Sequence, residues 1–240
     1  MQPIKATLLA LPLTALLLGC SANLPQVLQT GADVASASGY NNQAQLVQGI
    51  KEALELGSTR AALQLAATGG YSKSALYRIE LPENLQPLAK NLRQLGLGGQ
   101  LDNIEKLMNQ AAEQAAAEAS TVFVSAVKNM TITDALGIIR GGDTAATAYF
   151  RQQTEQVLRQ RYSPIIQQNL QQIGFYNQYQ QLLNSYNRLP LANKPSLDLE
   201  QHVLDRSLDA LFRQVAVEER AIRKDPVGSG SRIIGAVFAQ

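Results

Sequence analysis

The sequence predicts an all-α protein, a compact bundle of about seven to ten helices, for three reasons. Apolar residues recur every three or four positions along most of the chain, which is the spacing of one face of an α-helix. Glycine or proline interrupts these stripes at intervals typical of helix ends. Only residues 77–81 alternate apolar and polar side chains like a strand, and no other segment offers them a clear partner.

Local signals predict the elements of the first half of the chain. Asn41 or Asn42 caps the first helix, and the pair Gly69–Gly70 ends it. Residues 77–81 are expected to form a buried loop or a two-stranded ribbon, after which the helical spacing returns. Residues 121–130 have the composition of a strand, but their apolar spacing also fits a buried helix, which the neighbouring helical segments favour.

The second half of the chain also carries residues typical of helix starts and ends. Thr131 and Asp134 have the spacing of a capping box, with aspartate in place of the usual glutamate. Ser196 or Asp198 is expected to cap the most regular helix of the chain. A helix is expected to start again at Pro164 and to end at Gly174, and a loop is expected between Pro190 and Pro195. The pair Asp225–Pro226 is expected to stop the regular helix, after which a last turn, 233–238, docks on the helical body.

The first twenty residues carry the signals of an exported lipoprotein. Lys5 precedes an apolar run at 6–18, which is too short to span a bilayer and has the length of a signal-peptide core. The run ends in Leu17-Leu18-Gly19-Cys20, which resembles the lipobox of bacterial lipoproteins. The resemblance implies cleavage between Gly19 and Cys20 and lipid attachment to the sulfur of Cys20, the only cysteine in the chain. The alternative is an ordinary signal peptide followed by an incidental cysteine.

Three segments are therefore expected: a signal peptide at 1–19, a lipidated N-terminus and flexible tether at 20–42, and a single helical domain at 43–240. By resemblance to enterobacterial sorting, Ser21 favours the outer membrane, with the protein facing the periplasm and anchored by lipid without spanning the bilayer. Cleavage leaves 20 basic against 19 acidic residues, a formal net charge of +1, and no basic face. Nucleic acid is therefore not an expected partner.

The residue inventory limits the available chemistry. His202 is the only histidine, its neighbours suggest a partly exposed helical residue, and no serine has the context of a catalytic nucleophile. Zinc needs three or four histidine and cysteine ligands, and calcium needs closely spaced acidic loop residues, so neither a metal nor a cofactor is expected. Carboxylate catalysis stays open, because Asp134, Asp143, Asp198 and Glu200 all fall at loops or helix caps.

The candidate site is the corner Arg140, Gly141, Gly142, Asp143 and Thr144. Its glycines resemble a phosphate-binding turn, but no Walker pattern, lysine or preceding strand accompanies them. A structural role explains the corner equally well: a glycine after the first helix adopts a positive φ, and Asp143 caps the helix that follows. The two roles can coexist at one corner, and the sequence leaves both open.

Glutamine and tyrosine are concentrated after this corner. Eleven glutamines fall in the thirty residues 152–181, and seven of the thirteen aromatic residues fall between Tyr149 and Tyr186. Such a surface suits a glycan or a protein partner, because it forms hydrogen bonds without carrying much charge. Ordinary half-buried tyrosines beside solvated glutamines would produce the same composition.

Several segments together resemble one known family. They are "IKEALELGSTRA", "LPENLQPLAKNLRQLGLGG", "RGGDTAATAYFR", "KPSLDLEQHVLDRSLDALF" and "EERAIRKDP". In this order, behind a lipobox, they resemble a family of Gram-negative lipoproteins described only as a domain of unknown function, over about residues 45–238. The resemblance implies an exported, helical, lipid-anchored protein and includes the stretch 141–144. It implies no activity and no catalytic residue.

Three functions are consistent with these observations. The first is a non-enzymatic envelope lipoprotein that binds a protein or a glycan through its helical body. The second is a hydrolase or lyase that uses carboxylates around Asp143, and it requires Asp143 to lie in a concave pocket beside a second acidic or arginine side chain. The third is a lipid-binding carrier, which requires a large apolar cavity inside the bundle.

Overall fold

The computed structural model describes residues 43–172, 174–188, 198–226 and 228. The chain divides into two units, residues 1–41 and 42–240, and every described residue belongs to the second. The predicted signal peptide, the lipid site Cys20, the tether, the Pro190–Pro195 loop and the turn 233–238 lie outside the described residues.

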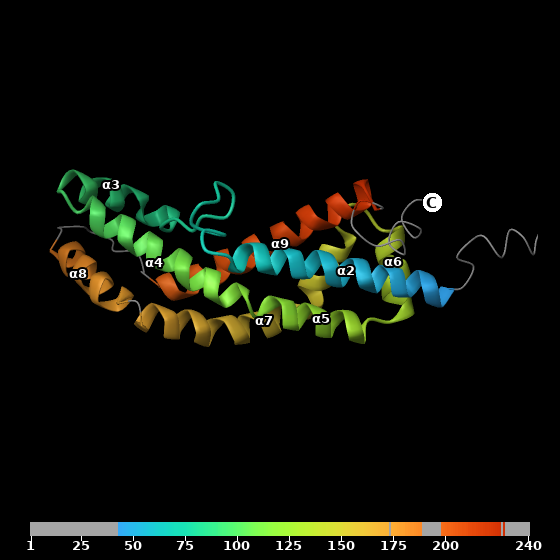
Figure 1. The fold of residues 1–240 in the computed structure, drawn as a ribbon. Helices are drawn as coiled ribbons and strands as arrows, with labels where there is room; N and C mark the ends of the chain where they lie inside the picture. Colours follow the sequence, from blue (N-terminus) through green and yellow to red (C-terminus); the bar gives the residue numbers. More distant parts are fainter. Residues whose placement is uncertain (1–42, 173, 189–197, 227, 229–240) are drawn as a thin grey trace, which may run out of the picture. The chain divides into compact units, whose positions relative to one another are not determined.

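The described residues form helices and connecting segments, with no strand among them. The elements are α2 (Gln43–Ala66), η1 (Glu83–Leu85), α3 (Gln86–Gln94), α4 (Gly98–Ala116), α5 (Ala119–Asn129), α6 (Ile132–Arg140), α7 (Ala145–Gln172), α8 (Phe175–Asn187) and α9 (Leu199–Lys224) (Figure 1). Their number falls within the predicted seven to ten, so the all-α prediction is confirmed. Residues 121–130 fall largely in α5, a helix and not a strand.

The core forms where α9 packs against α2 and α7, and where α4 packs against α7 (Figure 1). The rings of Phe123, Phe150 and Phe212 come from α5, α7 and α9 and meet in this core. The centroid of the Phe123 ring lies 4.9 Å from that of Phe150 and 6.2 Å from that of Phe212. Such tilted contacts stabilise beyond simple burial. The alanines of α4 are fully buried, and their small side chains allow neighbouring helices to approach closely: Ala111, Ala112, Ala115 and Ala116.

Pro164 lies inside α7, so the predicted new helix start at this residue was wrong. Proline removes one backbone hydrogen bond and disfavours a helix interior by roughly 3 kcal/mol. Burial offsets this cost, because one face of α7 carries four side chains spaced a turn apart and at most 1% exposed: Leu158, Tyr162, Ile166 and Leu170. Pro164 itself is exposed, and its ring therefore does not disturb this packing.

Residues 77–81 form no strand and instead run as a buried loop along α4. The backbone N–H of Ile79 donates to Asn109 Oδ1 at 2.9 Å, and Asn109 Nδ2 donates to the carbonyl oxygen of Ile79 at 2.8 Å. One side-chain amide thus satisfies both polar groups of a buried residue, as a neighbouring strand would. The buried-loop prediction is confirmed, and the two-stranded ribbon is excluded.

Two buried glutamates on the same face of α4 bind other parts of the segment that connects α2 to η1. Glu113 Oε1 accepts hydrogen bonds from four donors: the N–H groups of Gly69, Tyr71 and Ser72 and the Ser72 hydroxyl. Glu105 accepts from the guanidinium of Arg78 at 2.9 Å and from the N–H of Leu81 at 3.4 Å. Glu105, Asn109 and Glu113 lie one helical turn apart, and we call them the α4 clamp.

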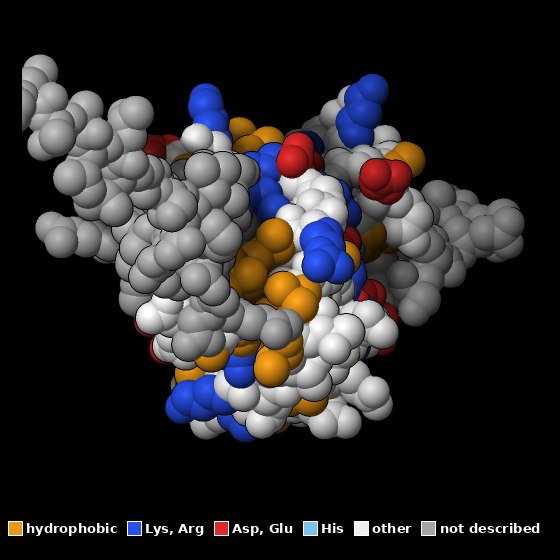
Figure 2. Space-filling model, turned by 90° about the vertical axis from the view of Figure 1, so that its right-hand side faces the viewer, with side chains coloured by type: hydrophobic (Ala, Val, Ile, Leu, Met, Phe, Trp, Pro, Cys, Tyr) orange, Lys and Arg blue, Asp and Glu red, His pale blue; other side chains and the backbone are white. Residues whose placement is uncertain are grey.

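Hydrophobic side chains are exposed in places. Figure 2 shows one face, on which they form a narrow strip with lysine and arginine side chains around it. The large hydrophobic side chains that are exposed across the described residues come from different elements, which is normal for a protein surface: Leu63, Leu76, Leu95, Ile132, Val157 and Val217. No single described helix has the length and hydropathy of a membrane span. One pair of segments, Gly98–Asn129 and Ile132–Arg140, meets both criteria when taken together, but the chain bends by 106° between them. Such a pair is weak evidence of a membrane span.

Candidate functional site

The predicted corner lies between α6, which ends at Arg140, and α7, which begins at Ala145. The predicted positive φ was wrong here, because Gly141 has φ −79° and ψ 172°, an extended conformation open to any residue. Among the described residues, positive φ values occur at Gly69, Gly96 and Gly174, which follow the ends of α2, α3 and α7. The glycine rule for helix ends therefore applies at those positions and not at the corner.

Gly141 is required for a different reason, which gives a first prediction. A Cβ atom on Gly141 would lie 2.5 Å from the Cβ of Ala145 and 3.1 Å from the carbonyl oxygen of Gly137, whereas a Cβ on Gly142 would meet nothing. We expect Gly141→Ala to lower the free energy of unfolding by about 1–3 kcal/mol through overpacking. Gly142→Ala should change it by no more than about 0.5 kcal/mol. Urea denaturation of both variants measures the difference, and equal effects would contradict the steric explanation.

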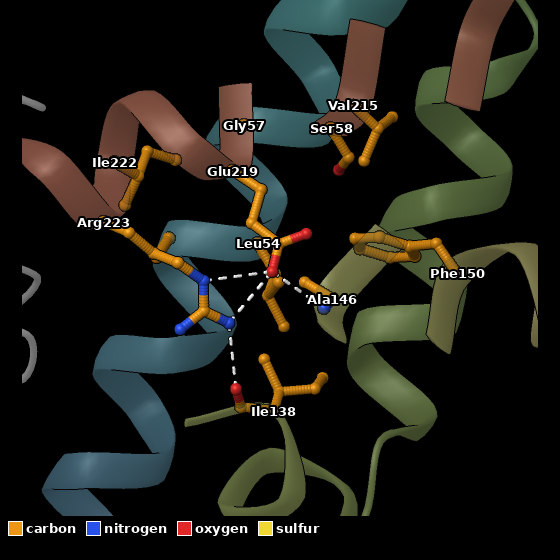
Figure 3. A pocket seen from close by; sticks show the side chains of 11 residues that line it. Leu54, Gly57, Ser58, Ile138, Ala146, Phe150, Val215, Glu219, Ile222 and Arg223 are labelled. Carbon is orange, nitrogen blue, oxygen red and sulfur yellow. Dashed lines mark hydrogen bonds and ion pairs between the residues drawn. The ribbon is translucent and has the colours of Figure 1, made fainter. Parts of the chain in front are cut away.

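The predicted capping role of Asp143 belongs to another residue. Asp143 is exposed, and its side chain forms no hydrogen bond within the described residues. Glu219 of α9 instead accepts from the N–H of Ala146 at 2.9 Å (Figure 3). It also accepts from the N–H and hydroxyl of Thr147 at 2.9 and 2.8 Å. The prediction was wrong because the true cap lies more than seventy residues away in sequence, where no local pattern reveals it.

Arg223 completes this arrangement. Its Nε and one terminal nitrogen donate to Glu219 Oε1 at 3.1 and 2.9 Å, and that terminal nitrogen also donates to the carbonyl oxygen of Ile138 at 2.9 Å (Figure 3). Both side chains are largely buried, with Glu219 6% and Arg223 16% exposed. The pair therefore ties the end of α6 and the start of α7 to α9, and these contacts fix the geometry of the corner.

The cavity beside this ion pair is small. Its volume is about 30 Å³, enough for roughly one water molecule, and apolar side chains such as Leu54, Phe150 and Ile222 form most of its wall. Asp143 does not line it. The cavity therefore fits neither the carboxylate site expected around Asp143 nor the large apolar chamber expected of a lipid carrier.

The other predicted carboxylates lie at separate helix ends. Asp134 forms the predicted capping box with Thr131, and the hydrogen bonds from the Thr131 hydroxyl and backbone lower the pKa of Asp134. Asp198 caps α9 by accepting from the N–H of Gln201 at 3.0 Å, and Glu200 accepts from the hydroxyl of Tyr176. Each carboxylate already serves a structural contact, and none of these contacts involves the Arg140–Thr144 corner.

His202 is half-buried on α9, as the sequence predicts. Its Nε2 lies 2.8 Å from the carbonyl oxygen of Glu80, so this nitrogen carries the proton and donates. Burial lowers the pKa of His202. The described residues contain no group of three or more histidine, cysteine, aspartate and glutamate side chains placed to hold a metal ion.

A larger concave site is a groove between α5 and α7, with a volume of about 520 Å³. One face of each helix lines it, and the N-terminus of α6 closes one end at Thr131 and Asp134. We call it the α5/α7 groove; its principal polar residues are Thr121, Ser125, Asn129, Tyr149, Gln153 and Arg161. The volume falls within the range of small-molecule sites.

Neutral polar side chains dominate this groove. The side chains of Ser125, Asn129 and Gln153 form no hydrogen bond within the described residues, so their donors and acceptors face solvent. Burial, together with the charge of Asp134, raises the pKa of Tyr149, which keeps its hydroxyl protonated. The groove thus offers several uncommitted hydrogen-bonding groups and little charge.

The described residues form a helical protein in which an ion pair of α9 holds the α6–α7 corner and neutral polar side chains line most of a groove between α5 and α7. The chain belongs to the family described as Protein of unknown function (DUF4197), whose model matches residues 40–239. This match confirms the predicted membership of a family known only as a domain of unknown function. Comparisons with curated proteins and with solved structures give no significant match.

Proposed function

We propose that this chain is a lipid-anchored protein of the bacterial cell envelope that binds an envelope protein or glycan through the α5/α7 groove, without catalysing a reaction. The observation that supports binding is the row of uncommitted neutral polar side chains along this groove. The lipobox-like Leu17-Leu18-Gly19-Cys20 supports the anchor, and Ser21 supports placement in the outer membrane, facing the periplasm.

The groove favours binding over hydrolysis. Carboxylate-based hydrolases of glycans use two carboxyl groups on either side of the scissile bond. Asp134 is the one carboxylate among the groove-lining residues, and it already accepts hydrogen bonds from the N–H and the hydroxyl of Thr131. At the corner, Asp143 forms no ion pair among the described residues and does not line the neighbouring cavity, so the corner gives the hydrolase or lyase alternative no support.

The anchor gives a prediction of its own. Replacing Cys20 with serine removes the sulfur that would carry the lipid, so the protein should remain an uncleaved precursor. Mass spectrometry of purified wild-type protein should show a mature chain that begins at an acylated Cys20. A wild-type chain with a bare residue 20, or a Cys20→Ser variant that is still cut and stays on the membrane, would refute the lipoprotein proposal.

Binding is tested by crosslinking in intact envelopes. A photo-reactive amino acid placed at Gln153, which lines the groove, should yield a reproducible adduct with a protein or a glycan. The matched control is the same replacement at Gln156, which is exposed on α7 but does not line the groove. Adducts of equal yield at both positions, or at neither, would remove the groove as the binding site.

A further inference from the structure

We propose that the ligand of the α5/α7 groove is an uncharged saccharide that carries N-acetyl groups. This inference rests on the proposed binding function and adds the chemical class of the ligand. Three properties of the groove carry it: its arginine is already paired with a carboxylate, its free polar groups both donate and accept, and apolar side chains lie between these polar groups in its lining.

The first property is that the groove offers no unpaired cation. At one end, the guanidinium of Arg161 lies 3.4 Å from the carboxylate of Glu118. At the other end, the carboxylate of Asp134 keeps its negative charge and accepts from the N–H of Thr131 at 3.0 Å and from its hydroxyl at 2.7 Å. An anionic ligand would lose hydration on entering the groove without meeting a free cation, so a ligand without negative charge is favoured.

The second property is the type of the polar groups and their repeat. Thr121, Ser125 and Asn129 project from α5 at four-residue intervals, roughly 6 Å apart along the helix. Tyr149 and Gln153 repeat at the same interval on α7. Hydroxyl and amide groups each donate and accept, which matches a ligand whose own hydroxyls and amides also do both at regular spacing. Saccharides have this character.

The third property is the apolar surface between the polar groups. Val122, Ala126 and Val157 contribute to the lining, and Val157 is 42% exposed. Their methyl groups suit the C–H faces of sugar rings and the methyl of an acetyl group, while the amides of Asn129 and Gln153 suit the acetamido N–H and carbonyl. Tyr149 adds an aromatic ring with a polar tip, a side chain that serves both kinds of contact.

Peptide ligands fit the groove less well. A docked helix needs a continuous apolar groove, whereas polar side chains interrupt the lining here on both helices. A docked strand needs an exposed sheet edge, and the described residues form no sheet.

Calorimetric titration of the full mature protein in detergent micelles tests the inference with three defined probes. They are triacetylchitotriose, which is neutral and N-acetylated; cellotriose, which has hydroxyls only; and trialanine, a zwitterionic peptide. Triacetylchitotriose should bind, and cellotriose should bind at least about tenfold more weakly because it lacks the acetamido groups. Trialanine should show no binding.

Variants locate the site. Asn129→Ala and Gln153→Ala should each weaken triacetylchitotriose binding about three- to tenfold, the effect of losing one or two neutral hydrogen bonds. Gln156→Ala should leave it unchanged. All three side chains are exposed, so the variants should keep the wild-type urea midpoint, which confirms that each is folded.

The outcomes separate this inference from the binding function. Equal binding of cellotriose, tighter binding of trialanine, no binding of triacetylchitotriose, or an unchanged affinity in Gln153→Ala would overturn the N-acetyl saccharide assignment. If the crosslink at Gln153 persists in intact envelopes in that case, the groove still binds a partner and only its chemical class is wrong. If the crosslink is also absent, the proposed function fails with it.

Discussion

Replacing Glu219 with alanine should lower the free energy of unfolding by about 3–5 kcal/mol, a large fraction of the stability of a typical domain. The carboxylate of Glu219 is buried and accepts from Ala146, Thr147 and Arg223. Its removal leaves two backbone N–H groups without their acceptor, and the largely buried guanidinium of Arg223 loses its bonds to the Glu219 carboxylate while it keeps its bond to Ile138. Breaking one partner of a buried ion pair costs more than the pair itself contributes, because the remaining charge stays desolvated.

Asp143→Ala is the matched control, because Asp143 is the residue that the sequence alone predicts as the cap. It is exposed and unbonded among the described residues, so its replacement should change the free energy of unfolding by no more than about 0.5 kcal/mol. Urea denaturation of the two variants gives the comparison. If Asp143→Ala proved the more damaging change, Asp143 and not Glu219 would be the cap of α7.

The second large effect is expected in the α4 clamp. Asn109→Ala should lower the free energy of unfolding by about 2–4 kcal/mol, because it leaves the buried N–H and carbonyl of Ile79 without partners. Asn109 also donates to the carbonyl oxygen of Glu105 at 2.7 Å, so the substitution removes three hydrogen bonds at once. The measurement is urea denaturation combined with hydrogen exchange at the amide of Ile79, which should become faster.

Gln110→Ala serves as the control for this position. Gln110 neighbours Asn109 on α4, and its side chain forms no hydrogen bond among the described residues. It should leave both the urea midpoint and the exchange at Ile79 nearly unchanged. Unchanged exchange at Ile79 in Asn109→Ala would show that the loop is held by other contacts.

Features set by neighbouring residues were predictable from the sequence. The capping box of Thr131 and Asp134, the cap at Asp198 and the stop at Asp225 each depend on groups within four residues, and each is confirmed. The all-α class also followed, because apolar periodicity records which face of each helix is buried. The sequence left residues 77–81 open between a loop and a ribbon, since the deciding partner, Asn109, lies thirty residues away.

Features set by distant residues were not predictable. The sequence assigned the cap of α7 to Asp143 and a positive φ to a glycine of the corner, whereas Glu219 caps α7 and crowding from Ala145 explains Gly141. The break expected at Pro164 failed because long-range burial outweighs a local preference.

Only one of the two helices that line the candidate groove was indicated by the sequence. The concentration of glutamine and tyrosine pointed to the α7 side, which supplies Tyr149 and Gln153. The α5 side was missed. Its signal would have been the four-residue spacing of Thr121, Ser125 and Asn129 beside the apolar Val122 and Ala126.

The capping of α7 by Glu219 also has a consequence for the order of events during biosynthesis. The ribosome makes the whole of α7 before it reaches codon 219, so until then the N–H groups of Ala146 and Thr147 have only water to accept from them. Contacts between such distant positions form late, since the intervening chain must first be brought together. The contacts of α9 with the corner therefore form late, and a polypeptide truncated before α9 should be degraded instead of accumulating.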